Sequence, residues 1–321
     1  MLIVQKFGGS SLADVHRLRA AAEISLRARR EGNDVIVVVS AMGESTDELL
    51  RLAREIDPAP PARELDALLS TGEQRSAALF AITLESLGQP AQSFSGWQAG
   101  LAAGGDYGDG RLGFLLPGRL TAALEEGLVA VVCGFQALNA AGDIITLGRG
   151  GSDTTAVALA AGLHADRCEI YTDVDGIYTA DPRLLPEARR LREIDGRDML
   201  RLARAGSQVL HDRSVELALA HGVEIRLLSA FTEGEGSRVC LLPAERRPDF
   251  AGLTRDAASG ALTLVGRAAD AAALSAVVLA LAEEKIPVLS GAVGDGSVSV
   301  RVPPERLEEA MSLVHRMVFG S

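Results

Sequence analysis

The sequence predicts an α/β protein: a three-layer α/β/α sandwich with a mostly parallel sheet, followed by a small α+β domain. Apolar runs of strand length alternate with segments of helical periodicity over residues 1–242. Strands that are apolar along their whole length are typical of a parallel sheet covered by helices on both faces. With 321 residues, of which 47% are hydrophobic, the chain is long enough to bury a large core in two domains.

The elements of the larger domain follow from the local periodicity of the sequence. We expect strands at 3–7, 35–40, 91–94, 128–134, 169–172 and 223–228, and helices at 14–31, 73–87 and 154–163. Proline and glycine interrupt this pattern in two places. We therefore expect surface loops at 56–61 and 104–110.

A domain boundary is expected at residues 243–248, PAERRP, where the periodicity breaks and the charge rises. The two domains would then comprise residues 1–242 and 249–321. The second has the order βαββα. Its strands are expected at 261–266, 288–293 and 297–302, and its helices at 271–284 and 304–318.

The overall composition restricts the kinds of partner. A formal net charge of −11 argues against a nucleic-acid-binding protein, which needs a basic surface. Cys133, Cys168 and Cys240 lie in apolar surroundings without metal-ligand spacing, so buried free thiols are expected. The sequence shows neither a leader peptide nor an apolar run long enough to span a membrane, and a cytoplasmic protein without a membrane partner is expected.

Residues 146–183 concentrate polar side chains around one apolar helical segment. The glycines beside Arg149 would let a ligand approach the backbone, and Ser152 and Asp153 are expected to cap the helix that follows. Arg149 suits a carboxylate or phosphate, and Asp153 suits an ammonium group. An amino-acid zwitterion would satisfy both. The residues from Thr172 to Gly176 follow an expected strand, and ligands bind at such strand ends in open α/β sheets.

The amino terminus has a second polar cluster, in which an apolar strand ends at Gly8 and Gly9. A turn of this kind presents amides to a phosphate at the start of a helix. The chain has 32 basic residues, of which only Lys6 and Lys285 are lysines. Because arginine fills nearly every other basic position, a lysine beside the two glycines indicates a role for a compact ammonium group next to a phosphate.

On these residues, the chain resembles aspartate kinases of the amino acid kinase family over roughly its first 240 residues. Seven segments match the family's motifs in order: KFGGSS, VVVSAMGESTDEL, LLSTGEQ, SFSGWQAG, VVCGFQ, LGRGGSDTTAVALAA and EIYTDVDGIYTADPR. The order βαββα of the carboxyl-terminal segment resembles an ACT domain. That resemblance implies a homodimer formed through this domain, whereas effector binding is less expected, because 267–273 lacks the usual proline and glycine.

The resemblance implies transfer of the γ-phosphoryl group of ATP to the side-chain carboxylate of L-aspartate, the first step towards lysine, threonine and methionine. It implies catalytic roles for Lys6, Arg149 and Asp153. It places Lys6, Gly8, Gly9, Ser10, Thr172, Asp173, Tyr178 and Arg183 at the nucleotide, and Ser40, Thr46, Glu73, Arg149, Gly150, Gly151, Ser152 and Asp153 at the aspartate. Mg²⁺ would arrive on the nucleotide phosphates, so no protein metal site is expected.

One segment departs from the family pattern. Where aspartate kinases usually read GAKVLH[PS]R, residues 206–213 read GSQVLHDR, so Gln208 replaces a lysine that reaches the nucleotide phosphates. Loss of a cation beside a developing phosphoryl charge weakens catalysis, and Arg204 or Arg213 could supply the charge instead. Two alternatives therefore stay open: a related kinase with another acceptor, and a binding or regulatory subunit with little or no turnover.

Overall fold

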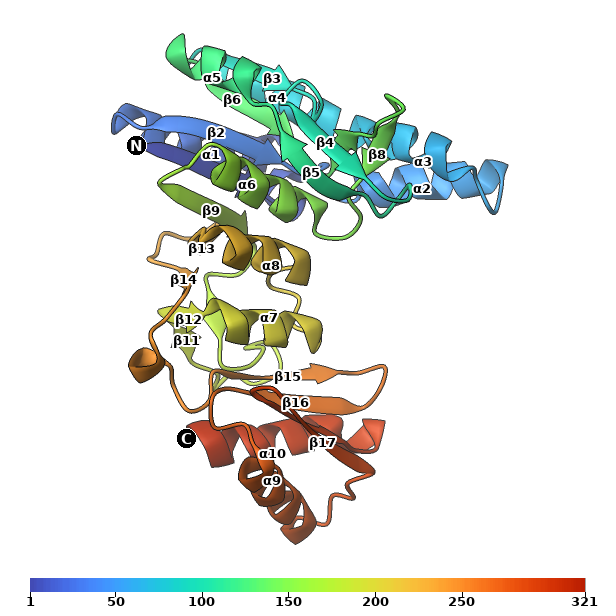
Figure 1. The fold of residues 1–321 in the computed structure, drawn as a ribbon, viewed down its shortest axis with the longest axis vertical. Coiled ribbons are helices and arrows are strands. Elements are labelled where there is room, and N and C mark those ends of the chain that lie inside the picture. Colours follow the sequence, from blue (N-terminus) through green and yellow to red (C-terminus); the bar gives the residue numbers. More distant parts are fainter. Residues whose placement is uncertain (321) are drawn as a thin grey trace. The chain divides into compact units, whose positions relative to one another are not determined.

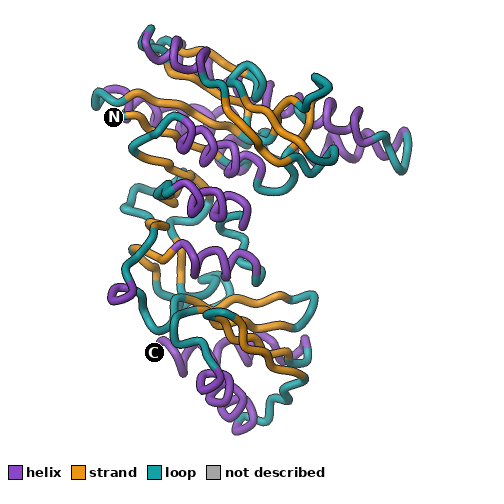
Figure 2. Tube along the Cα trace, viewed as in Figure 1, coloured by secondary structure: helices purple, strands orange, loops and turns teal. Residues whose placement is uncertain are grey.

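Two units make up the chain, and residues 1–320 are the part that the computed structural model describes (Figures 1 and 2). The first unit comprises residues 1–175 and 220–235, and the second comprises 176–219 and the residues from 236 onward. The expected boundary near residue 242 therefore does not separate these units, because 176–219 folds with the carboxyl-terminal residues. A catalytic domain of 1–242 and an ACT-like domain of 249–321 stay predictions.

A parallel sheet forms the centre of the first unit, with strand order β13-β9-β1-β2-β6-β3. Its strands are β1 (Leu2–Phe7), β2 (Asp34–Val39), β3 (Ala91–Phe94), β6 (Val129–Cys133), β9 (Arg167–Thr172) and β13 (Ile225–Ser229). The register aligns their carboxyl ends: Phe7 lies opposite Val39 and Tyr171, and Val39 lies opposite Cys133. Side chains and loops that follow these strands consequently share one edge of the sheet.

Helices cover both faces of this sheet, so the expected three-layer α/β/α fold is confirmed. On one face, α1 (Val15–Arg30) and α4 (Thr71–Ser86) bury Leu18, Phe80 and Leu84 against Phe7 and the valines of β2. On the other face, α6 (Gly151–Gly162) packs across β1, β2 and β9. The helix α5 (Gly118–Glu125) packs against β6.

A smaller sheet that we did not expect extends the first unit, with strand order β5-β4-β7-β8. Its strands are β4 (Leu101–Gly104), β5 (Arg111–Leu115), β7 (Gln136–Leu138) and β8 (Ile144–Thr146). The helices α2 (Ser45–Ile56) and α3 (Ala62–Leu69) lie near it, and α3 packs on β8. The expected loops lie at 57–61, between α2 and α3, and at 105–110, between β4 and β5.

The second unit contains the expected small α+β domain. Its antiparallel sheet has the order β15-β16-β18-β17, from β15 (Gly252–Asp256), β16 (Ala261–Val265), β17 (Ser290–Gly294) and β18 (Ser297–Arg301). The strand β15 was not expected. The helices α9 (Ala271–Glu283) and α10 (Leu307–Phe319) share a core with this sheet, and Ala180 and Leu185 complete that core. This burial explains why residues around 180 fold with the carboxyl-terminal part.

Shorter elements complete the second unit. The strands β10 (Ile177–Tyr178) and β11 (Arg190–Leu191) pair antiparallel, and β12 (Glu193–Asp195) and β14 (Ser237–Cys240) pair parallel. Two helices follow β12, namely α7 (Gly196–Arg204) and α8 (Asp212–His221). Three short 3₁₀ helices lie at Ser10–Leu12, Ala244–Arg246 and Pro304–Arg306.

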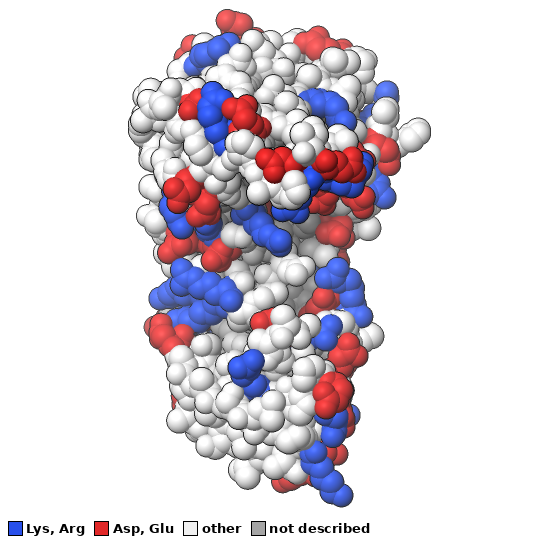
Figure 3. All heavy atoms as spheres, turned by 90° about the vertical axis from the view of Figure 1, so that its right-hand side faces the viewer, with Lys and Arg blue, Asp and Glu red and all other residues white. Residues whose placement is uncertain are grey.

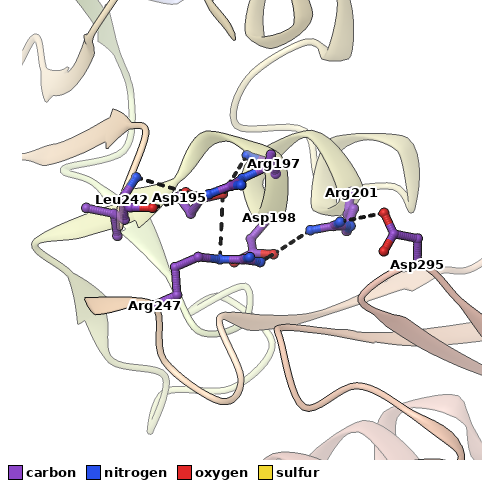
Figure 4. Close-up of polar contacts among 7 residues, drawn as sticks. All are labelled: Asp195, Arg197, Asp198, Arg201, Leu242, Arg247 and Asp295. Carbon is purple, nitrogen blue, oxygen red and sulfur yellow. Dashed lines mark hydrogen bonds and ion pairs between the residues drawn. The ribbon is translucent and has the colours of Figure 1, made fainter. Parts of the chain in front are cut away.

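Two fully buried carboxylates at the start of α7 organise a network of arginines (Figure 4). Asp195 caps the helix and binds Arg197, with Nε at 2.8 Å from Oδ1. Asp198 accepts from Arg201 and from Arg247, each at 2.8 Å. Arg201 also reaches the exposed Asp295, in the turn between β17 and β18, at 2.9 Å. The network therefore ties α7 both to the segment before β15 and to the antiparallel sheet.

Removal of Asp198 tests this network. We expect Asp198→Ala to lower the free energy of unfolding by about 3 kcal/mol, because Arg201 and Arg247 would lose their buried partner. Asp295→Ala is the matched control: Asp295 pairs with the same Arg201, but its side chain is 99% exposed, and exposed ion pairs contribute little. Urea denaturation measures the free energy of unfolding of both variants. Equal urea midpoints for the two variants would contradict the prediction.

Candidate active site

The side chains of Lys6 and Asp153 meet at the carboxyl-terminal edge of the parallel sheet. Lys6 is the penultimate residue of β1, and Asp153 lies in the first turn of α6. The Nζ of Lys6 lies 2.7 Å from Oδ1 of Asp153, and the two side chains are only 11% and 13% exposed. An ion pair this buried fixes the position of the ammonium group at the start of α6. The two polar clusters of the sequence thus converge on one point.

The glycine turn after β1 lies beside this ion pair. A Cβ atom placed on Gly8 would lie 3.5 Å from Nζ of Lys6, and one on Gly9 would lie 2.8 Å from the carbonyl oxygen of Ala41. A 3₁₀ helix begins directly afterwards, at Ser10. The first amides of a helix have no partner within it and attract anions. The turn is therefore a suitable place for a phosphate next to the lysine.

The loop after β2 lies next to the same glycines. The amide of Ser40 donates to the carbonyl of Phe7 at 3.1 Å, and the amide of Gly43 donates to the carbonyl of Gly9 at 3.0 Å. Thr46 follows in the first turn of α2, half-buried. These bonds bring Ser40 to the edge of the sheet where Lys6 lies.

Glu73 is a buried acid in the first turn of α4, only 3% exposed. Its Oε1 accepts a hydrogen bond from the amide of Ala41 at 3.0 Å, whereas its Oε2 has no hydrogen-bond partner within residues 1–320. Burial raises the pKa of Glu73 from 4.5 to about 8, although the Ala41 hydrogen bond opposes the shift. A buried carboxyl oxygen without a partner is costly, and it can bind a cationic ligand.

The glycine-rich loop before α6 has a different geometry from the one expected. The helix begins at Gly151 and is capped by Gly150, whose φ of 68° is left-handed. Ser152 and Asp153 therefore do not cap the helix, because they already belong to its first turn. Ser152 is buried against Gly134, where an added Cβ would lie 2.7 Å from its Oγ. The side chain of Asp153 is thereby left to pair with Lys6.

Arg149 lies between Gly148 and Gly150, which both have positive φ angles of 70° and 68°. Its side chain is exposed and forms no ion pair with any residue of the described part of the chain. An exposed, unpaired guanidinium at this position is suited to an anionic ligand.

The residues expected at the nucleotide are divided between the two units. Thr172 ends β9, at the same edge as Phe7, and its Oγ1 donates to Oδ1 of the exposed Asp173 at 3.0 Å. Tyr178 and Arg183 belong to the second unit. Arg183 binds Asp181 through Nε at 3.0 Å and Nη2 at 2.9 Å.

The segment with the unusual glutamine also lies in the second unit, directly after α7. Of the two arginines suggested as substitutes for the missing lysine, Arg204 pairs with Glu216 at 3.2 Å. Arg213 follows Asp212 at the start of α8, where its amide donates to Oδ1 of Asp212 at 2.9 Å.

Sequence reasoning missed some residues that build the site. The amide of Ala41 and the close contact at Gly134 act through the backbone, which a residue-type pattern does not show. Asp66 was also missed, although an acid between the leucines of LDALL is a visible signal: it is buried and accepts hydrogen bonds from Thr146.

No group of three or more His, Cys, Asp or Glu side chains within residues 1–320 could hold a metal ion. Within the same residues, every helix is too short or too polar to cross a membrane. In Figure 3, acidic and basic side chains lie next to one another in several groups, and uncharged residues cover much of the rest of this face.

The fold and the site together define a class of protein. The chain belongs to the amino acid kinase family, whose model matches residues 1–229. Among its relatives, the aspartokinase of Corynebacterium glutamicum is 47% identical over 292 residues, which is 89% of this chain and 69% of that protein. The aspartokinase of Mycobacterium tuberculosis is 49% identical over 270 residues, 83% of this chain and 64% of that protein. The chain thus spans about two thirds of the length of these relatives.

The fold is also found in a solved structure. The crystal structure of E. coli aspartokinase III in complex with aspartate and ADP matches with a TM-score of 0.86, over 99% of this chain and 100% of that chain. The two sequences are 22% identical, so this match supports the fold.

The raised pKa of Glu73 predicts how stability depends on pH. The folded protein keeps this proton up to a pH of about 8, whereas the unfolded chain releases it near 4.5. The free energy of unfolding therefore falls as pH rises through this range, by an amount on the order of 5 kcal/mol. In Glu73→Gln the side chain is neutral at every pH, so the free energy of unfolding of this variant should not show the fall that Glu73 causes. Urea denaturation between about pH 5 and pH 9 measures the difference between the two proteins.

Glu85→Gln is the control for that experiment, because Glu85 lies on the same helix and is exposed. Its stability should follow that of the wild type at each pH. Parallel curves for the wild type and Glu73→Gln would show that Glu73 is already ionised in the folded protein.

Proposed function

We propose that this chain transfers the γ-phosphoryl group of ATP to the side-chain carboxylate of L-aspartate, forming 4-phospho-L-aspartate and ADP. The observation that carries the proposal is the 2.7 Å ion pair between Lys6 and Asp153 beside the Gly8–Gly9 turn. It joins the glycine turn that we assign to the phosphates to the start of α6, which we assign to the amino acid. The aspartokinase relatives support aspartate as the acceptor.

The nucleotide would bind over the turn after β1. Its terminal phosphates would lie against Gly8, Gly9 and Ser10, with the Lys6 ammonium group neutralising the charge that develops during transfer. Mg²⁺ would arrive with the nucleotide and bridge its phosphate oxygens, which requires few protein ligands. Thr172, Asp173, Tyr178 and Arg183 would contact the rest of the nucleotide, as the family resemblance implies.

Aspartate would bind between Glu73 and Arg149. The unpartnered Oε2 of Glu73 is suited to the substrate ammonium group, and the unpaired guanidinium of Arg149 is suited to a carboxylate. Asp153 already binds Lys6, so we assign it mainly to positioning that ammonium group rather than to binding the substrate amine. Ser40, Thr46, Gly150, Gly151 and Ser152 would complete the pocket.

The chemistry needs no general base. The attacking group is a carboxylate, which is already ionised at neutral pH. Phosphoryl transfer depends mainly on positioning and charge neutralisation, and the site offers a buried lysine and a helix amino terminus for both. Two alternatives rest on Gln208: a related kinase with another acceptor, and a regulatory subunit with little turnover. A cytoplasmic location also stays a prediction.

An ADP-release assay with different acceptors tests the function. We expect turnover with L-aspartate, and little with L-glutamate, N-acetyl-L-glutamate, carbamate or UMP. Lys6→Ala should lower kcat by about 100-fold or more, because the transition state loses its cation. Lys285→Ala is the control, because it removes the other lysine of the chain. Turnover with a different acceptor would favour the related kinase, and aspartate binding without turnover would favour the regulatory subunit.

We also propose that the chain forms a homodimer through its carboxyl-terminal sheet. The strand β17 lies at the edge of that sheet, carries no charged residue, and is exposed along its whole length. Leu279 and Leu289, in the same unit, are each 66% exposed. An uncharged, exposed edge strand readily pairs with a second copy of itself.

A charge on β17 tests the dimer. We expect Val293→Lys to give a monomer, because a buried lysine at the edge would oppose strand pairing. Val15→Lys, at an exposed position of α1 in the first unit, should leave the mass unchanged. Light scattering after size exclusion measures the mass of each. A point substitution is preferable to deletion of 249–321, which would remove part of the core shared with 176–219. A dimeric Val293→Lys protein would refute pairing through β17.

A further inference from the structure

We infer that Asp66 is a positioning residue that holds Glu73 and Arg149, the two arms of the aspartate pocket, at a fixed separation. It would thereby determine the affinity for aspartate and the preference for aspartate over glutamate, which is one methylene longer. This inference rests on the proposed function, since it concerns the same pocket. Asp66 is not expected to touch the substrate.

The carboxylate of Asp66 is 1% exposed and accepts three hydrogen bonds. Its Oδ2 accepts from the amide of Gly108 at 2.9 Å and from the amide of Thr146 at 2.8 Å. Its Oδ1 accepts from Oγ1 of Thr146 at 2.7 Å. Hydrogen bonds to a buried carboxylate are stronger and shorter than those between neutral groups. The carboxylate therefore binds α3, the end of β8 and the 105–110 loop to one another.

Thr146 connects this carboxylate to the first arm of the pocket. It ends β8, and Arg149 follows three residues later. Between them, the amide of Leu147 donates to the carbonyl of Phe135 at 2.8 Å, and Gly148 begins the left-handed glycine turn. An arginine between two left-handed glycines has few constraints of its own. Its position therefore depends on the anchors on either side, which are Thr146 and the start of α6.

The helix α3 connects the same carboxylate to the second arm. The amide of Ser70 donates to the carbonyl of Asp66 at 3.1 Å, and the buried Gln136 donates through Nε2 to the carbonyl of Ser70 at 2.8 Å. The helix α4 begins at the next residue, and Glu73 lies in its first turn. Asp66 thus connects two parts of the pocket. Its backbone carbonyl bonds to Ser70, just before the helix of Glu73, and its carboxylate bonds to Thr146, just before the loop of Arg149.

The glycine-rich loop reinforces this arrangement. The amide of Gly110 donates to the carbonyl of Thr146 at 2.8 Å, and a Cβ atom on Gly110 would lie 3.0 Å from that oxygen. A second set of contacts links the same loop to α3: Tyr107 donates to Asp143 at 2.9 Å, and Arg63 of α3 binds the same carboxylate. The 105–110 loop therefore packs against both Thr146 and Asp66.

Thr146→Val tests the inference with a near-isosteric change, because it removes only the hydroxyl donor to Asp66. We expect the KM for aspartate to rise about tenfold, with kcat and the KM for ATP within about twofold, since misplaced pocket residues weaken substrate binding. The ratio of kcat/KM for aspartate to that for glutamate should fall about fivefold. Asp66→Asn should show the same pattern more strongly. Thr146→Ser, which keeps the hydroxyl group, should restore wild-type values.

Thr121→Val is the matched control. Within residues 1–320, the one hydrogen bond of Oγ1 of this exposed threonine goes to the carbonyl of Pro117, just before α5. Its kinetics should equal those of the wild type. If Thr146→Val and Asp66→Asn lower the melting temperature but leave the aspartate KM and the acceptor ratio unchanged, Asp66 is only a structural residue and the inference is wrong.

Calorimetric titration with aspartate separates this inference from the proposed function. If the wild type binds aspartate without turnover, the proposed function fails, and the dissociation constants of the same variants still decide the role of Asp66. A tenfold weaker binding by Thr146→Val, restored in Thr146→Ser, supports it. If the wild type releases ADP with aspartate while all the variants bind equally well, the function stands and the inference is overturned.

Discussion

The ion pair between Lys6 and Asp153 is the interaction on which the site depends. It joins the central strand of the parallel sheet to the start of α6, on the face opposite α1 and α4. A buried charge is costly unless an opposite charge lies against it, so each of these two side chains compensates the charge of the other. The register of the parallel strands then brings the loop after β2 and the end of β9 to the same edge.

Much of the fold was predictable, because the signal was local. The valines of β2 and the apolar run of β6 are buried on both faces, which is how strands of a covered parallel sheet appear in a sequence. The short strands β4 (LAAG) and β8 (IIT) gave no such signal, because three or four residues are too few to establish a strand pattern. The division into two units was not predictable either. It depends on Ala180 and Leu185, which are buried against residues far from them in the sequence.

The candidate site was predictable where residue types carried the information. A rare lysine between an apolar strand and two glycines indicated the position of Lys6, and the glycine-rich loop indicated that of Asp153. The start of α6 was wrong by a few residues, because Gly150 caps the helix in place of Ser152. The environment of Glu73 was not predictable, since its burial and its Ala41 contact arise from distant segments.

The protonation of Glu73 has a consequence for ligand binding. With a pKa of about 8, this carboxyl group is largely neutral in the empty site at neutral pH. An amine placed against Oε2 favours the ionised form, so uptake of the amino acid would expel a proton into the solvent. The heat of binding would then change with the ionisation enthalpy of the buffer. A rise in the pH of the surroundings would increase occupancy of the pocket without any other change in the protein.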